Sequence, residues 1–314
     1  MGIANYIYLA IFISTIIYLL YRYADAFKIK LIASIPVLLL LAYFSHSFIV
    51  LPIFIFSMFL GTYLYTVFFY FPFAVDFVLI VIATAGKLIP LRFIFASISM
   101  AILISMFLDK NMKKYDLMNK ESKGKDIKIE TNRDYFQIAA GIVTLLIFLI
   151  AGLQGRIIVL ITVFLIYLVG NILYLNNKNR IAVMVYSMER DNTKLGLGSM
   201  YLAAGFLLIL AFVRSMPVIY ISIFILMIGD SLATIIGMNM HSPKLFYNHK
   251  KSVAGFLAML IPSMLFGFID LAFIVSFVYA TGATFAESIS NRVADDNITI
   301  PVAIVIVHFL IIAL

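Results

Sequence analysis

Asp230 carries the strongest chemical signal in the sequence, because it lies deep within the apolar run PVIYISIFILMIGDSLATIIG. A carboxylate at such depth in a membrane segment is strongly unfavourable unless it has a partner. It either forms a hydrogen bond between helices or belongs to a functional site, and the sequence favours the site. Gly229, Ala233 and Gly237 recur every four residues, so one helix face stays small. Such a face permits close approach of another helix or of a phosphate group.

The loop after this run is basic and ends where the next helix is predicted to begin. Its titratable side chains are His241, Lys244, His249, Lys250 and Lys251. Ser252 and Gly255 open the next helix, and a helix N-terminus beside a lysine attracts anions. We therefore predict that Lys250, Lys251, Ser252 and Gly255 contact phosphate. For Lys244 and Lys250 the alternative is an ordinary basic loop of a membrane protein.

Two further polar stretches, ERDNTKLGLGSMY at 189–201 and GATFAESISNRVADDN at 282–297, supply more carboxylates. Carboxylates at helix ends can hold Mg²⁺, which prefers oxygen ligands and bridges phosphates. The predicted metal ligands are Asp230, Glu189, Glu287, Asp295 and Asp296. Arg190 and Asn297 join the predicted nucleotide contacts, together with Gly229 and Gly237. For Asp295 and Asp296 the alternative is a cap at the start of the last helix.

These residues together indicate a magnesium-dependent site at the membrane face, with Asp230, Lys251 and Glu287 as its catalytic core. Such a site suits phosphoryl or nucleotidyl transfer to a lipid, because positioning and charge neutralisation do most of that chemistry.

The elements that must position these residues are membrane helices. Hydrophobic residues make up 64% of the 314 residues and charged residues only 12%, against roughly 45–50% and 25% in soluble domains. The composition excludes a secreted enzyme, a free nucleic-acid binder and a disordered regulator. With no cysteine, disulfides and thiolate sites are excluded as well. We predict an all-α, polytopic transmembrane helix bundle of about 10–12 spans.

The polar gaps between these spans set the predicted domains and orientation. An N-terminal helix block covers 1–108, a basic loop covers 109–134, and the catalytic transmembrane domain covers 135–314. Twelve spans would place 19 of the 23 basic residues on one side. By the positive-inside rule that side, with the motif loops, is cytoplasmic. The predicted spans lie at about 3–20, 31–44, 48–68, 74–86, 91–108, 135–152, 157–175, 199–213, 216–237, 252–269, 271–283 and 298–314.

In order and spacing, the strings GDSLATIIG, KSVAG, ATFAES and DDNITIP resemble the dolichol kinase and phytol kinase family of CTP-dependent polyprenol kinases. This family is related to phosphatidate cytidylyltransferases. RDYFQIAAG at 133–141 resembles the family's opening motif. The resemblance covers about 133–314. Departures from the family pattern are Asp134 for a basic residue, Gln137 for His, Ala254 for Glu and Phe256 for Ser or Thr.

The resemblance implies transfer of the γ-phosphate of CTP to a long isoprenoid alcohol of the dolichol type, with membrane lipid around the substrate. It implies that Asp230 holds Mg²⁺ or activates the hydroxyl and that Lys251 neutralises phosphate charge. Glu189, Glu287, Asp295 and Asp296 would supply metal or nucleotide contacts, and Arg190 would contact phosphate.

Two other functions stay open at this point. A cytidylyltransferase would share the GD string and the lysine loop, but its usual HGG and DR strings do not occur here. A secondary transporter would use Asp230 and Glu287 as cation sites, but it predicts internal symmetry, and the halves show no repeat. The sequence does not distinguish the alcohol or the oligomeric state.

Overall fold

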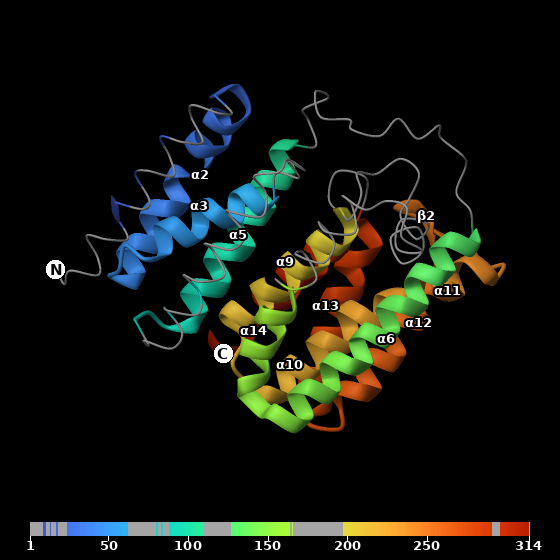
Figure 1. Cartoon of the computed structure of the whole chain (residues 1–314). Helices are drawn as coiled ribbons and strands as arrows, with labels where there is room; N and C mark the ends of the chain where they lie inside the picture. Colours follow the sequence, from blue (N-terminus) through green and yellow to red (C-terminus); the bar gives the residue numbers. More distant parts are fainter. Residues whose placement is uncertain are drawn as a thin grey trace. The chain divides into compact units, whose positions relative to one another are not determined.

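The computed structural model describes residues 24–61, 88–109, 127–163, 197–290 and 296–313, with the isolated residues 9, 10, 13, 17, 80, 83 and 165 (Figure 1). It is an all-α helical bundle with a single short hairpin in the described ranges, so the predicted fold class is confirmed. Contacts divide the chain into two compact units, Met1–Leu117 with Val163–Leu175, and Met118–Thr162 with Asn176–Leu314.

In the first unit the described helices are α2 (Ala24–Ser45), α3 (Val50–Gly61) and α5 (Leu91–Asp109). Helix α5 packs against both α2 and α3. Because α3 is apolar around its whole circumference, most of its described side chains are buried. Lys30 was expected in a polar gap, but it lies inside α2, and its Nζ donates to Ser105 Oγ at 3.2 Å.

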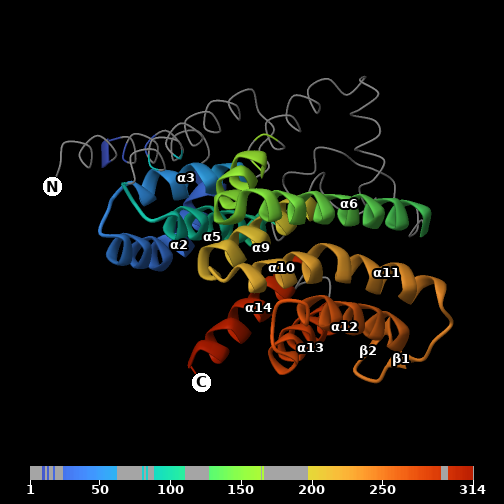
Figure 2. The ribbon, with the colours of Figure 1, turned by 90° about the horizontal axis from the view of Figure 1, so that it is seen from below.

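The second unit contains the predicted catalytic residues Asp230, Lys251 and Glu287. Its elements are α6 (Ile127–Ala151), η3 (Gly152–Gln154), α9 (Leu197–Phe212), α10 (Met216–Ile223), the π-helical segment η4 (Phe224–Gly229), α11 (Asp230–Asn239), β1 (Lys244–Leu245), β2 (Asn248–Ser252), α12 (Val253–Gly267), α13 (Phe273–Ile289) and α14 (Asp296–Ala313). Figure 2 shows that α10, η4 and α11 form one continuous helix between α6 and α12.

Three described helical stretches are long and apolar enough to cross a membrane: Thr131–Val163, Met216–Asn239 and Asp296–Ala313. They overlap spans that were predicted within 135–314, whereas the full count of 10–12 spans stays a prediction. Helix α6 begins at Ile127, so the last part of the predicted 109–134 loop is helical. The polar residues in 127–134 continue an apolar helix by another two turns, and hydropathy alone does not reveal such an extension.

Helices α11 and α12 approach closely because glycines line their contact. A Cβ on Gly255 would lie 2.7 Å from the Ala233 carbonyl oxygen, and one on Gly237 would lie 3.0 Å from Ser252 Oγ. Gly229, the last residue of η4, also faces α12, since a Cβ there would lie 2.9 Å from Ser263 Oγ. The small helix face therefore meets another helix, which is one of the two roles that the sequence allowed.

Candidate active site

Asp230 begins α11, directly after the π-helical segment η4, and its side chain is buried. Gln137 of α6 donates from Nε2 to Asp230 Oδ2 at 3.3 Å and to the Leu226 carbonyl at 3.0 Å. A π-helical turn shifts the backbone hydrogen-bond register, which leaves carbonyls open to side-chain donors. Asp230 Oδ1 is buried and has no hydrogen-bond partner in the described part of the chain. The carboxylate is therefore held on one side and open on the other.

Lys251 of β2 lies between two carboxylates. Its Nζ forms an ion pair with Glu287 Oε1 of α13 and lies 3.7 Å from Asp296 Oδ2 at the start of α14. The Glu287 side chain is 3% exposed and that of Lys251 is 25% exposed. The pair therefore lies at the edge of the packed bundle, with the ammonium on the more open side.

The charge of Lys251 is maintained by its neighbours. Burial by itself lowers the pKa of the ammonium, but Glu287, Asp296 and Asp230 act in the opposite direction. The net pKa of Lys251 is raised above its ordinary value. Lys251 therefore stays cationic throughout the physiological range, as an anion-binding residue must.

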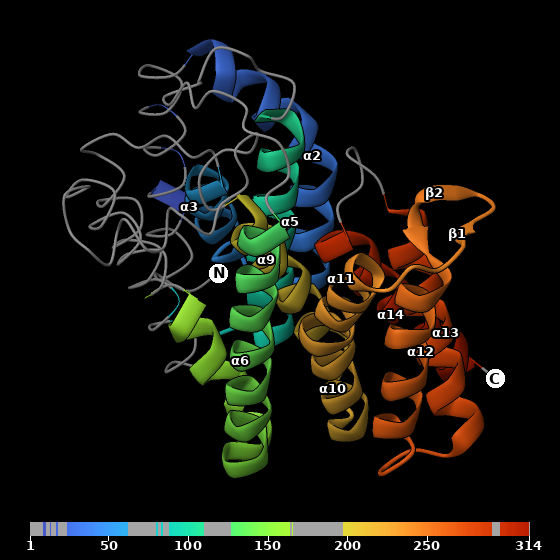
Figure 3. The same ribbon diagram turned by 90° about the vertical axis from the view of Figure 1, so that its right-hand side faces the viewer.

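These groups form one electrostatic cluster at one end of the second unit. Glu287, Asp296, Lys251 and Asp134 all lie close enough to Asp230 to interact with its charge. They come from α13, α14, β2 and α6, elements that are far apart in the sequence. Figure 3 shows the hairpin at this end of the bundle, above α11, α12 and α13. The predicted catalytic residues Asp230, Lys251 and Glu287 are thus brought into one cluster.

The β1–β2 hairpin is fastened to the end of α13, a feature the sequence did not predict. Tyr247 Oη and Ser288 Oγ lie 2.8 Å apart, and Asn248 Nδ2 donates to the Ser288 carbonyl at 2.8 Å. Asn248 Oδ1 also accepts from the Lys250 amide at 3.2 Å. These bonds hold β2 beside α13, and this places Lys251 against Glu287.

The N-terminus of α12 is not open to an anion, contrary to the expectation from the sequence. Its first amides, those of Val253, Ala254 and Gly255, donate to the Pro243 carbonyl, Ser242 Oγ and Ser252 Oγ, respectively. The two residues just before β1 and the last residue of β2 thus supply the capping acceptors, which satisfy amides that a helix start otherwise leaves free. Ser252 is a helix cap in the structure. Its predicted contact with phosphate, like that of Gly255, gains no support from this geometry.

Some of the other residues that were predicted to bind nucleotide or metal lie in the described ranges, and the others lie outside them. Lys250 is exposed on the hairpin, and Asn297 lies in the first turn of α14, where its backbone N–H donates to Asp296 Oδ1 at 3.1 Å. Glu189, Arg190 and Asp295 lie outside the described residues, so their roles stay predictions. Gly229 and Gly237 pack against α12, as described above, and their contact with a nucleotide stays a prediction too.

Gln137 and Asp134 are site residues that the sequence-based selection missed. Both stand in the RDYFQIAAG string, where they were noted only as departures from the family pattern. They are three residues apart, so they lie on the same face of α6. Asp134 is buried, and Arg133 Nη2 lies 3.6 Å from its Oδ1. That spacing was the available signal, but nothing in the sequence says that this face meets Asp230.

The carboxylates of the cluster are compatible with a Mg²⁺ ion that takes its other ligands from water and phosphate. No group of three or more His, Asp or Glu side chains in the described ranges is arranged to hold a metal ion by itself. Mg²⁺ in nucleotide-dependent enzymes is commonly held by one or two carboxylates, with water and substrate phosphates as the other ligands. The open Asp230 Oδ1 fits a site of that kind.

Comparison with known proteins connects part of this chain to plant phytol kinases. It is 32% identical over 119 residues to a probable phytol kinase 2 of Glycine max, a match covering 33% of this chain and 41% of the relative. It is 33% identical over 127 residues to a probable phytol kinase of Triticum aestivum, covering 35% and 42%. An uncharacterized protein of Methanocaldococcus jannaschii is 34% identical over 116 residues, covering 36% and 59%.

The similarity supports a phytol kinase-like family at a coarse level. The chain spans about two fifths of the length of the plant relatives it matches. No family model matches the chain, and no solved structure matches it.

Proposed function

We propose that this chain is a membrane-embedded kinase that transfers a phosphoryl group from CTP to a long-chain isoprenoid alcohol, producing the alkyl monophosphate and CDP. The observation that carries the proposal is the buried Asp230 beside the ion cluster of Lys251, Glu287 and Asp296. Gln137 donates to one oxygen of the Asp230 carboxylate, and the other oxygen has no hydrogen-bond partner in the described ranges. The similarity to phytol kinases supports the class of acceptor. The resemblance of the sequence strings to CTP-dependent polyprenol kinases supports CTP as donor. The distribution of basic residues supports the cytoplasmic face as the site's location.

In this proposal Asp230 acts on the alcohol. The hydroxyl oxygen attacks the γ-phosphorus, the bond between that phosphorus and the β,γ-bridging oxygen breaks, and the hydroxyl proton passes to Asp230. Phosphoryl transfer has a loose transition state, so a base need only accept the proton late in the reaction. The Gln137 side-chain amide donates to Oδ2 and so fixes the orientation of the carboxylate, which leaves Oδ1 without a hydrogen bond.

Lys251 neutralises the charge of the transferred phosphoryl group. Its ammonium already sits among carboxylates, so a nucleotide phosphate would compete with Glu287 and Asp296 for it. A bound Mg²⁺ would supply further charge neutralisation, with Asp230 and Glu287 or Asp296 as its protein ligands. Positioning and electrostatics of this kind account for most of the rate in phosphoryl transfer.

The deciding experiment uses the purified chain in detergent with labelled CTP and a panel of acceptors that includes phytol, geranylgeraniol and dolichol-type alcohols. We expect an alkyl monophosphate and CDP. Release of pyrophosphate with a CDP-linked lipid would instead show a cytidylyltransferase. The sequence resemblance suggested dolichol, whereas the named relatives favour a shorter phytol-like chain, and the panel separates the two.

Asp230→Asn should abolish this turnover while the protein stays folded, because Asn keeps the size but loses the charge. Asp270→Asn is the matched control, since Asp270 lies exposed in the turn at the other end of the unit. Activity of Asp230→Asn within a few-fold of the unaltered protein would make Asp230 a structural residue and would overturn the site.

A further inference from the structure

The second unit has an apolar pocket of about 430 Å³ that the proposed kinase chemistry does not use. It is formed by the end of α9, the start of α10, the turn before α13 and the end of α14. Val218, Leu271, Val275, Ile311 and Ile312 make up its apolar walls. The pocket is lined by the start of α13, whereas Glu287 lies at that helix's end. It therefore lies at the end of the unit opposite the acidic cluster.

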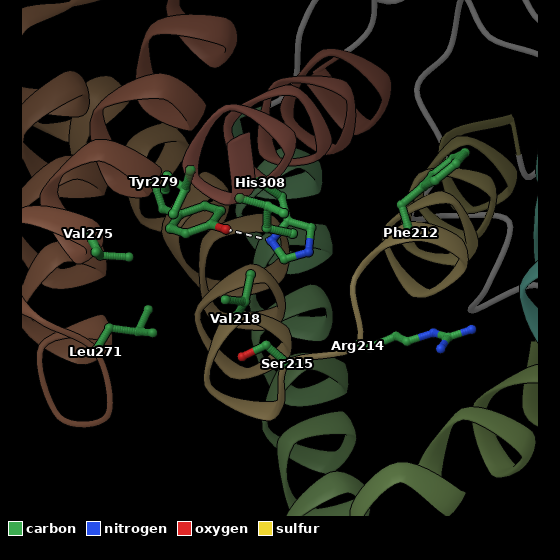
Figure 4. A pocket seen from close by; sticks show the side chains of 10 residues that line it. Phe212, Arg214, Ser215, Val218, Leu271, Val275, Tyr279 and His308 are labelled. Carbon is green, nitrogen blue, oxygen red and sulfur yellow. Dashed lines mark hydrogen bonds between the residues drawn. The ribbon is translucent and has the colours of Figure 1, made fainter. Parts of the chain in front are cut away.

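The two polar side chains of the inner wall of this pocket, Tyr279 and His308, form a hydrogen bond with each other. Tyr279 Oη and His308 Nδ1 lie 2.8 Å apart, and both side chains are buried. Figure 4 shows the pair joined across the pocket, between α13 and α14. Because the two polar atoms satisfy each other, the surrounding space suits hydrocarbon rather than a polar ligand.

The pocket mouth is cationic. Arg214 and Ser215 are exposed there, and Figure 4 shows the Arg214 guanidinium directed away from the Tyr279–His308 pair. Arg156, in the helical stretch after η3, lies close enough to interact electrostatically with Arg214. Its Nη2 donates to the Val213 carbonyl at 2.7 Å. Within the described ranges, neither arginine has a carboxylate at ion-pair distance, and the buried Arg156 Nε has no hydrogen-bond partner.

A cavity of hydrocarbon character with Arg214 at its mouth, and a second arginine, Arg156, close enough to interact with Arg214, is complementary to an anionic amphiphile. We propose that the pocket binds one tail of an anionic bilayer phospholipid, whose headgroup phosphate lies at Arg214. Arg156, which lies near Arg214, adds positive charge to this headgroup site. Free phosphate would leave the apolar walls empty, and a zwitterionic lipid would leave the arginines without a net counter-charge. This lipid site does not depend on the proposed function.

The sequence contains no tryptophan, so a single introduced tryptophan reports the lipid around it without background. Phe212→Trp places this reporter at the pocket, where Phe212 makes an edge-on contact with Phe309 at 5.7 Å between ring centroids. Phe273→Trp is the matched control. Phe273 lies at the same end, does not line the pocket, and makes an edge-on contact with Phe268 that is also 5.7 Å long.

The measurement is quenching of tryptophan fluorescence in vesicles that contain brominated phosphatidylglycerol or brominated phosphatidylcholine. For the full chain with Phe212→Trp, we expect half-maximal quenching at a roughly three- to five-fold lower mole fraction of the anionic lipid, as partly exposed ion pairs allow. Phe273→Trp should show no such preference. Adding Arg214→Gln to Phe212→Trp should abolish the preference, whereas Arg214→Lys should keep most of it and shows that the fold tolerates substitution there.

Two results would overturn this lipid site. One is identical quenching curves for the two lipids in Phe212→Trp. The other is a preference that persists unchanged in Arg214→Gln. A third variant tests the pocket itself: Val275→Phe fills it and should lower quenching of Trp at 212 by either lipid. If Val275→Phe leaves the quenching unchanged, the tail does not occupy this pocket.

Discussion

Lys251 takes part in both the stability and the chemistry of the second unit. Its ammonium compensates the buried carboxylate of Glu287 and lies next to Asp296. Removing one partner of a buried ion pair leaves an uncompensated charge, whereas removing both can be nearly neutral. Activity measurements on single variants would therefore combine a loss of stability with a loss of catalysis. The thermal stability of the Lys251 and Glu287 variants must be measured first.

We expect Lys251→Met to lower the thermal stability more than Lys251→Met combined with Glu287→Gln. Lys244→Met is the control, since Lys244 is exposed on β1. The raised pKa of Lys251 sets the pH dependence: its contribution is fully present below the unfolded pKa of about 10.4 and is lost as pH rises through the folded value. The loss in Tm caused by Lys251→Met should thus be constant from pH 6 to 9. A loss that changes across that window would show that another group controls it.

Gln137 positions Asp230, although it does not itself touch the reacting atoms in the proposed mechanism. Gln137→Leu should lower kcat by roughly ten- to a hundred-fold, because small misplacements of a catalytic group have effects of that size. KM for CTP should change little. Gln137→His retains a ring N–H donor and should restore much of the rate. Gln154→Leu, on the exposed η3 turn, is the control. An unchanged kcat in Gln137→Leu would assign this hydrogen bond to structure alone.

At the scale of elements, the α11–α12 contact and the hairpin determine where Lys251 lies. The two helices can approach closely because they meet through Gly237 and Gly255, and the segment between them, which contains the hairpin, supplies the acceptors that cap α12. The site's cation is therefore placed by a helix–hairpin–helix module.

The two glycines of this module should differ in their tolerance of a methyl group. Gly255→Ala would bring its Cβ within 2.7 Å of the Ala233 carbonyl, which is backbone and cannot move aside cheaply. Gly237→Ala would meet the Ser252 hydroxyl at 3.0 Å, which can rotate. We expect Gly255→Ala to destabilise by about 1–3 kcal/mol, typical of overpacking, and Gly237→Ala by less. Thermal unfolding in detergent measures both. Equal losses would contradict the module's geometry.

The sequence predicted the helices of this module well and its connections poorly. Apolar runs set the helix positions, because length and hydropathy dominate in a membrane segment. The hairpin could not be predicted, because its strands are short and polar. Its position also depends on hydrogen bonds from Tyr247 and Asn248 to Ser288, which is distant in the sequence. Capping of α12 by Ser242 and Pro243 depends on that fold, so the sequence could not show that the first amides of this helix already have acceptors.

For the whole molecule, the distribution of basic residues predicts one orientation in the membrane. The cysteine-free background allows clean tests at the two ends of the second unit. Phe246→Cys, at the exposed hairpin tip, should react with an impermeant thiol reagent only after the membrane is opened. Ser215→Cys, at the opposite end, should react on intact cells. The reverse pattern would place the motif loops outside and overturn the predicted topology.

The composition of the site could be predicted in part because its residue types are rare in such an apolar chain. Asp230, Lys251 and Glu287 stood out against their surroundings, and the structure groups them. Asp134 and Gln137 did not, because one lay beside a basic stretch and the other is an uncharged residue near the start of a long helix. Which face of α6 meets Asp230 is a property of tertiary packing, and one sequence does not contain that information in readable form.

The π-helical segment Phe224–Gly229 has a consequence for how related sequences should be aligned. A π turn accommodates one more residue than an α-helical turn. If the same residues formed an uninterrupted α-helix, Asp230 would therefore face a direction about 100° away from its present one. A relative with an uninterrupted α-helix here would keep both flanking segments in phase only if it were one residue shorter. The expected difference is therefore a one-residue gap rather than a substitution, and an alignment without that gap would match Asp230 with a residue on another face of the helix.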